Sequence, residues 1–123
     1  MHKCLTYFLI YSKRMIDMKI IVEALGLSED VISKMTEQSL EIGRCNKYDV
    51  NINNMIRTTI KSLVGKEDIL LALKEKYNLE FYLSKVVMLD VKSNIPNPIL
   101  SLEGDVIEFL YKTNTIDDID YYL

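Results

Sequence analysis

The sequence predicts a single α+β domain, with a mainly antiparallel sheet and helices packed on one face. Its 123 residues are 49% hydrophobic and 27% charged, the ordinary composition of one globular domain. Short apolar runs rich in β-branched and aromatic residues alternate with segments of helical periodicity. No internal repeat or low-complexity tract divides the chain, so we expect residues 1–123 to form one unit.

The chain is expected to begin with a strand followed by a helix. Residues 5–12 are rich in aromatic and β-branched side chains and too few for a helix, which predicts a buried strand. Apolar residues then recur at helical spacing from Ile16 to Leu25, with Asp17 near the start and Gly26 just past the end. This pattern predicts a helix over that segment.

The middle of the chain has weaker signals. Residues 27–43 have the composition of an irregular connection, in which residues 28–30 open a short helical turn. The alternation of Tyr48, Val50 and Ile52 with polar residues predicts a second strand, paired with residues 40–45.

Helical stripes follow this second strand. Residues 55–64 and 69–77 each carry an apolar stripe, and they form either two helices or one helix broken at Gly65.

The last third of the chain is more regular. Residues 79–91 contain an extended apolar run typical of a central strand. Residues 94–98 contain both prolines and are expected to break the chain. A helix is then predicted from Ser101 to Asn114, and residues 116–123 are predicted to form a final strand.

The residue inventory excludes several kinds of chemistry. The single histidine is His2, so there is no internal imidazole for a catalytic relay or a histidine-ligated zinc site. His2 and Cys4 together would make a poor metal site near a terminus, and a solvated histidine is expected instead. Cys4 and Cys45 belong to no C-x-x-C pair and are expected to be reduced; the alternative is a bridge between them. We therefore expect neither a catalytic residue, a cofactor nor a metal.

Targeting and charge signals are equally informative. The apolar run near the start is short, is followed at once by Lys13 and Arg14, and lacks a cleavage site, so it is not a signal peptide. No stretch approaches the length of a membrane span, and we expect a cytoplasmic protein. The net charge of −3 and pI near 5.2 argue against a nucleic-acid binder.

Charge is concentrated at the end of the chain. Residues 97–123 carry six carboxylates and one lysine, whereas residues 1–96 have a slight excess of base. Asp118 and Asp120 are expected to share one strand face, with Asp117 on the other. The segment is interpreted as a solvated edge, a hard-cation site or a docking surface for a basic partner. The candidate contact residues are Glu108, Asp117, Asp118, Asp120, Tyr121 and Tyr122.

The chain resembles a bacterial family of small uncharacterised domains. The resemblance is carried by the run from Thr6 to Ile10, by Ala24 to Leu27, and above all by the closing segments 96–102, 106–110 and 116–122. It differs at Ser28, where the family commonly has proline, and at Tyr48, where it has tryptophan. The resemblance implies a ferredoxin-like α+β fold and almost nothing about activity.

Two classes of function follow from these observations. The first is a non-catalytic binding protein, most concretely a bacterial immunity protein or antitoxin that neutralises a basic toxin, such as a nuclease, by occluding it. The second is a small-ligand-binding module or a weakly active enzyme working between sheet and helices. Residue chemistry favours binding over catalysis, while the oligomeric state stays open.

Overall fold

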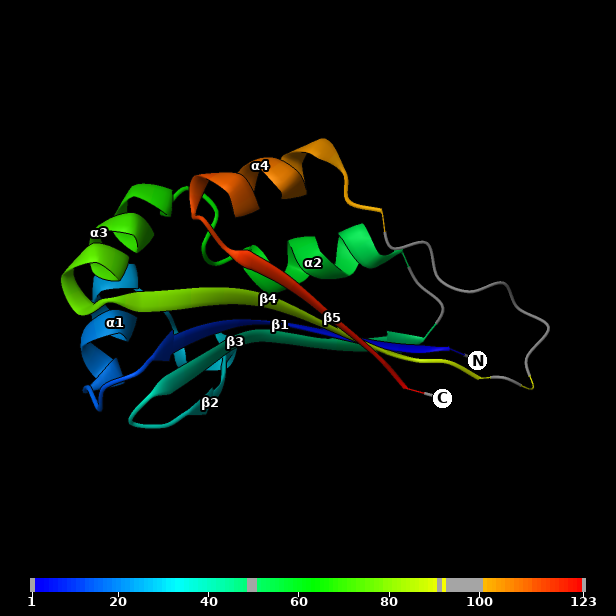
Figure 1. Ribbon diagram of the computed structural model, residues 1–123, viewed down its shortest axis with the longest axis horizontal. Coiled ribbons are helices and arrows are strands. Elements are labelled where there is room, and N and C mark those ends of the chain that lie inside the picture. The colour runs from blue at the N-terminus through cyan, green and yellow to red at the C-terminus, as the bar shows by residue number, and fades with distance from the viewer. Residues whose placement is uncertain (1, 49–50, 91, 93–100, 123) are drawn as a thin grey trace.

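The computed structural model describes residues 2–48, 51–90, 92 and 101–122, which form an α+β domain of two layers (Figure 1). A five-stranded sheet carries the helices on one of its sides, and this confirms the predicted α+β class. A short 3-10 helix at Glu29–Val31 precedes β2. The elements, in chain order, are β1 (Lys3–Ser12), α1 (Met18–Leu25), β2 (Ile32–Met35), β3 (Ser39–Tyr48), α2 (Ile52–Ile60), α3 (Glu67–Tyr77), β4 (Leu79–Met88), α4 (Gly104–Lys112) and β5 (Ile116–Tyr122).

The sheet is mixed, with strand order β2-β3-β1-β4-β5. The pairings of β2 with β3, β3 with β1 and β1 with β4 are antiparallel. Strand β5 pairs with β4 in the parallel sense, because α4 carries the chain back along the sheet before β5 begins. The sheet is thus mainly antiparallel, but this order does not confirm the ferredoxin-like arrangement.

The core lies between the sheet and the helices. Along β1, the side chains of Cys4, Phe8 and Ile10 are fully buried on the helix side. Their neighbours Tyr7 and Leu9 point to the other side and are only half-buried. The ring of Phe8 contacts Phe81 of β4 and Phe109 of α4, with centroids 5.7 and 6.1 Å away, so the core reaches from the central strands to the outermost helix.

The predicted first helix is confirmed together with its ends. The Asp17 carboxylate caps α1 by accepting from the Lys19 backbone N–H at 3.1 Å, and Gly26 ends the helix in the left-handed conformation at φ 61°. Lys66, just before α3, donates from Nζ to the Leu25 carbonyl at 2.5 Å. That bond satisfies a free carbonyl at the end of α1 and joins α1 to α3.

The prediction for the middle of the chain is wrong in two places. Residues 27–43 are more regular than an irregular connection, since they contain β2 and the first half of β3. The predicted strand around Tyr48 and Ile52 is displaced: the strand ends at Tyr48, and Ile52 already belongs to α2. The Asn51 side chain accepts from the Asn53 backbone N–H at 2.8 Å and starts that helix, and this capping role outweighs the alternation of apolar residues.

The structure also differs from the sequence prediction, or decides between its alternatives, at several other helices and strands. Residues 40–45 and Tyr48 belong to the same strand, β3, which pairs with β1, so the predicted pairing between them is wrong. The helical stripes on either side of Gly65 form two helices, and Gly65 lies between them at φ 89°. The predicted strand over 79–91 ends at Met88, and α4 begins at Gly104 instead of Ser101. Val50 and the predicted break at 94–98 lie outside the described residues.

His2 is buried instead of solvated. Only 2% of its surface is exposed, and its Nδ1 accepts a hydrogen bond from the Asp90 backbone N–H at 2.9 Å. The hydrogen bond to Asp90, just after β4, explains why His2 is buried. Its position near the terminus had predicted a solvated side chain. Cys4 and Cys45 are both buried and no disulfide joins them, so the alternative of a bridge between them is wrong.

Helix α2 comes very close to the sheet at Gly43 of β3. Gly43 has φ 69°, and a Cβ built there would lie 2.1 Å from the carbonyl oxygen of Thr59 in α2. The Thr59 hydroxyl donates to the Gly43 carbonyl at 2.7 Å and lies 2.7 Å from the Thr6 hydroxyl of β1. Because Thr59 has one hydroxyl hydrogen, Thr6 is the donor in that second bond. Helix α2 is thereby bonded to two neighbouring strands.

We expect Gly43→Ala to destabilise the fold by about 2–4 kcal/mol, because the methyl group adds overlap with α2 to the cost of a left-handed backbone. Urea unfolding followed by circular dichroism measures this difference. Gly104→Ala is the matched control, since nothing lies within 4 Å of a Cβ at that position. Similar stabilities for the two variants would contradict the close approach.

Candidate functional site

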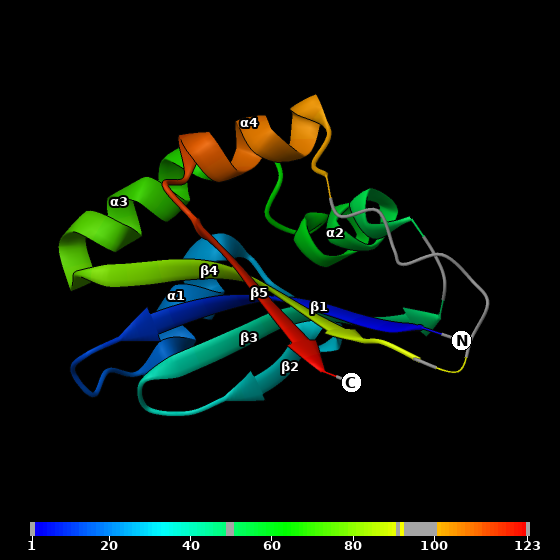
Figure 2. The same ribbon diagram turned by 45° about the vertical axis from the view of Figure 1, so that its right-hand side comes forward.

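One side of the sheet is covered by none of the described helices, and the closing strand β5 forms one edge of it (Figure 2). It is here called the open face. Its side chains alternate along each strand with those of the core. Most of the tyrosine and aliphatic side chains at its centre are half-buried by their neighbours. The side chains of the open face include Leu5, Tyr7, Leu9, Tyr11, Glu41, Arg44, Glu80, Tyr82, Ser84, Val86, Asp118, Asp120 and Tyr122.

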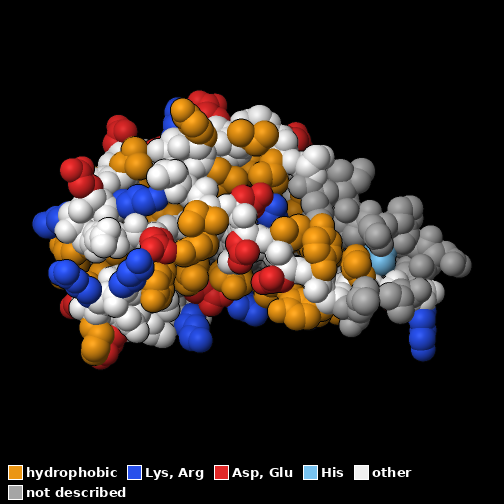
Figure 3. All heavy atoms as spheres, viewed as in Figure 1, with side chains coloured by type: hydrophobic (Ala, Val, Ile, Leu, Met, Phe, Trp, Pro, Cys, Tyr) orange, Lys and Arg blue, Asp and Glu red, His pale blue; other side chains and the backbone are white. Residues whose placement is uncertain are grey.

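Strand register brings the two ends of the chain together on this face. Tyr7 is paired with Ser84, and Ser84 with Asp118, so one row crosses from β1 to β5. The adjacent row runs from Leu5 through Val86 to Asp120 in the same way. The aspartates therefore lie beside an apolar and aromatic surface, and Figure 3 shows carboxylates among apolar side chains over β5.

The charges on the β1 and β3 side of the open face are engaged within the protein. Arg44 Nη1 lies 2.7 Å from Glu41 Oε1, and the guanidinium carbon lies 6.0 Å from the centre of the Tyr7 ring. On β4, the Tyr82 hydroxyl donates to the Glu80 carboxylate, and this bond, with burial, raises the pKa of Tyr82. Tyr82 consequently keeps its proton and presents a neutral ring.

The structure divides the predicted contact residues between the two sides of β5. Asp118, Asp120 and Tyr122 share the open face, as the alternation predicted for the two aspartates. Asp117 and Tyr121 lie on the helix side, because they pair with Leu83 and Val87 of β4, which are fully buried. The three open-face residues are all exposed and form the part of the predicted surface that the fold brings together.

Asp117 is already bonded within the protein. Its carboxylate oxygens lie 2.8 and 3.0 Å from Nζ of Lys85, whose side chain is only 3% exposed. A buried ammonium group without an anion is costly, so this carboxylate compensates the charge of Lys85. Asp117 therefore supports the attachment of β5 to β4 from the helix side.

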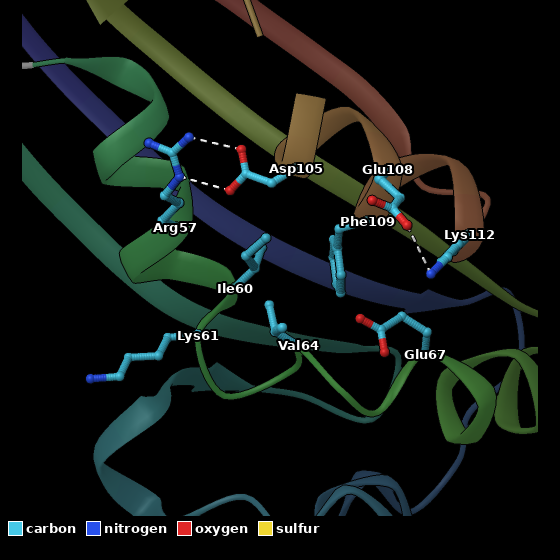
Figure 4. Close-up of a pocket in the computed structure, with 9 residues that line it drawn as sticks. All are labelled: Arg57, Ile60, Lys61, Val64, Glu67, Asp105, Glu108, Phe109 and Lys112. Atoms are coloured by element: carbon cyan, nitrogen blue, oxygen red, sulfur yellow. Dashed lines mark hydrogen bonds and ion pairs between the residues drawn. The ribbon is translucent and has the colours of Figure 1, made fainter. Parts of the chain in front are cut away.

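Glu108 lies away from the sheet, on α4, where it borders a hollow of about 490 Å³ between α2 and α4 (Figure 4). Its carboxylate lies 3.0 Å from Lys112 one turn later. Across the hollow, Arg57 of α2 donates two hydrogen bonds of 2.8 Å to Asp105 and lies 3.1 Å from Glu103. These pairs neutralise much of the charge in the hollow and join α4 to α2.

The amide of Asn53 adds to this connection. Its Nδ2 donates to the Ser101 carbonyl at 2.9 Å, and its Oδ1 accepts from the Glu103 backbone N–H at 2.8 Å. Asn53 is 5% exposed, and these two bonds hold the chain at the entry to α4. The position of β5 therefore depends on α2 through both a buried amide and a surface ion pair.

Sequence reasoning missed the aromatic half of the open face. Tyr7, Tyr11 and Tyr82 were not among the predicted contact residues. For Tyr7 and Tyr11 the signal was present in the period of two along residues 3–11, where they alternate with Cys4 and Phe8. That pattern gives the side of a strand but not whether a helix covers that side.

The described residues contain no group of three or more His, Cys, Asp or Glu positioned to hold a metal ion. Among the described helices, none has the length and apolar character needed to cross a membrane.

No family model, no curated protein and no solved structure matches this chain.

We expect Asp117→Ala to destabilise the protein by about 2 kcal/mol, because it leaves the Lys85 ammonium buried without its anion. Adding Lys85→Met should recover most of this loss in urea unfolding, since the buried charge is removed as well. Asp118→Ala, the adjacent residue on the exposed side, should change stability by less than about 0.5 kcal/mol. Equal losses for both aspartates would contradict the assignment.

The Arg57 guanidinium holds the pKa of Asp105 at about 2, below its ordinary value of 3.8. A carboxylate with a lower pKa in the folded state stabilises the fold above the unfolded value and loses that effect as pH falls through about 2. Asp105→Asn should therefore be less stable than wild type at pH 6, with the difference vanishing towards pH 2. Urea unfolding over this range measures it, and an NMR titration of Asp105 with a midpoint near 4 would contradict the ion pair.

Proposed function

We propose that the chain is a protein-binding domain whose open face and closing strand hold a basic protein partner. In its most concrete form it is an immunity protein or antitoxin that neutralises a toxin by occluding it. One observation carries the proposal: the exposed carboxylates of Asp118 and Asp120 lie in register with the helix-free surface around Tyr7 and Val86.

The apolar part of this surface suits a protein interface. Tyrosine side chains offer a large rigid ring and a hydroxyl, and they are enriched among the residues that dominate binding energy. Tyr7, Tyr11 and Tyr82 lie on adjacent strands of the open face and are already partly desolvated by one another. Ordering them further on binding costs little side-chain entropy.

The charged part of the surface supports a basic partner. Asp118 and Asp120 are exposed, whereas Arg44, on β3 of the same face, is held by Glu41 and adds little free positive charge. Carboxylates at the rim of an interface mainly raise the association rate and select partners of opposite charge. Occlusion fits this division of roles, because tight capping of a toxin needs rapid encounter and a broad contact surface, not a reaction.

The partner can be captured through the open face itself. A photoreactive benzoylphenylalanine replacing Tyr82 should form an adduct with a basic protein in the native host, identified by mass spectrometry. The same group replacing Tyr111, which is 85% exposed on α4, is the control and should not give this adduct. A toxin partner should lose its activity when mixed with one equivalent of the chain.

The purified partner then tests the charges. Replacing Asp118 and Asp120 by lysine should slow association about tenfold or more at low salt, and the difference should shrink at high salt. Replacing Glu23 and Glu75 by lysine makes the same charge change on exposed positions of α1 and α3 and should leave the rate nearly unchanged. Equal rates for the two variants, or identical adducts from both photoreactive positions, would rule the proposal out.

A further inference from the structure

A second surface lies at the end of the sheet where β1 leads into α1. The loop of residues 13–17 and Ser12, the last residue of β1, are fixed against the β2–β3 turn by three hydrogen bonds. Ser12 N–H donates to the Gln38 carbonyl and Ile16 N–H to the Glu37 carbonyl, both at 2.8 Å, and Gln38 Nε2 donates to the Lys13 carbonyl at 3.1 Å. This loop is therefore held in one conformation before any ligand arrives.

One hollow beside the loop is rich in methionine. It has a volume of about 500 Å³, and its lining includes Met15, Met18 and Met35. Met15 is 68% exposed and Met35 is 44% exposed. The carboxylates of Asp17 and Glu37 also border this hollow, and that of Asp17 is already used as the cap of α1. Methionine side chains adapt to different apolar groups, so the hollow suits an apolar side chain of a partner.

The adjoining hollow is basic. It measures about 460 Å³, shares Met15 with the first hollow, and is lined by Lys13, Arg14 and Lys76 but by no carboxylate. Lys13 is 73% exposed, and its ion pair with Glu80 is long, at 3.8 Å. Figure 3 shows lysine and arginine side chains gathered at this end of the molecule. The hollow therefore presents positive charge that the protein itself only partly compensates.

From these two hollows we propose that this end binds an acidic peptide segment, with carboxylates near Lys13, Arg14 and Lys76 and an adjacent apolar side chain among Met15 and Met35. Charge complementarity selects the acidic part, and the shared wall at Met15 places the apolar part next to it. A free anion would leave the methionine hollow unfilled, and a membrane surface would not enter two concave sites. The lining of the site does not include Asp118 or Asp120, and the proposal does not depend on the proposed function.

The test uses a phage library of random dodecapeptides panned against the full chain. Enriched peptides should carry at least two acidic residues next to Leu, Phe or Met. A fluorescein-labelled copy of the most enriched peptide should bind about tenfold more weakly when Lys13, Arg14 and Lys76 are all replaced by glutamine. Met15→Ala should also weaken binding, because it removes apolar contact without touching the charges.

The control removes the same amount of charge elsewhere. Replacing Lys34, Lys47 and Lys61, all exposed, by glutamine should change the affinity less than about twofold. The Asp118→Lys and Asp120→Lys variant should still bind the peptide, which separates this site from the open face. The proposal is overturned if no peptide is enriched, if the enriched peptides lack acidic residues, or if both lysine sets weaken binding equally. It is also overturned if the chain binds phosphatidylserine vesicles but none of the peptides.

Discussion

The contact between Gly43 and Thr59 sets the spacing of the two layers. A side chain at position 43 would overlap the backbone of α2, so the absence of a Cβ lets that helix approach the sheet. The Thr59 hydroxyl uses this proximity to bond both β3 and β1. Helix α2 in turn positions α4 through the side chains of Arg57 and Asn53, and α4 leads directly into β5. The position of the acidic strand β5 thus depends on a contact between α2 and β3, which β1 and β4 separate from β5 in the sheet.

The closing strand combines two different electrostatic roles in consecutive residues. Asp117 faces the helices and compensates a buried lysine, whereas Asp118 faces away from them and keeps its charge in solvent. Successive side chains of a strand point to opposite faces of the sheet, so two consecutive aspartates can take these two different roles. The net charge of the closing segment therefore overstates what is offered to a partner, since part of it serves the fold.

Much of the fold could be predicted from the sequence where one signal dominated. The apolar run of β1, the Asp17 and Gly26 ends of α1 and the stripes on either side of Gly65 each gave a correct element. Prediction failed at Asn51, where alternation and capping compete and the helix cap prevails. The burial of His2 depends on the distant Asp90, which local sequence does not indicate.

The candidate site was less predictable than the fold. Alternation correctly placed Asp118 and Asp120 together, but grouping Glu108 and Asp117 with them required a common surface that the topology does not provide. The tyrosines of the open face were missed because the position of the helices is a tertiary property. A strand pattern shows two sides, and only the packed molecule shows which one is covered.

The parallel pairing of β5 has a consequence for the order of folding. An antiparallel neighbour can form through a short turn, but β5 can join β4 only after the chain has crossed back through α4. Its two open-face aspartates therefore join the rows of Tyr7 and Leu5, across Ser84 and Val86 of β4, only when this crossover is complete. The combined surface distinguishes the finished domain from a nascent or partly unfolded chain, which carries the same residues but not their arrangement.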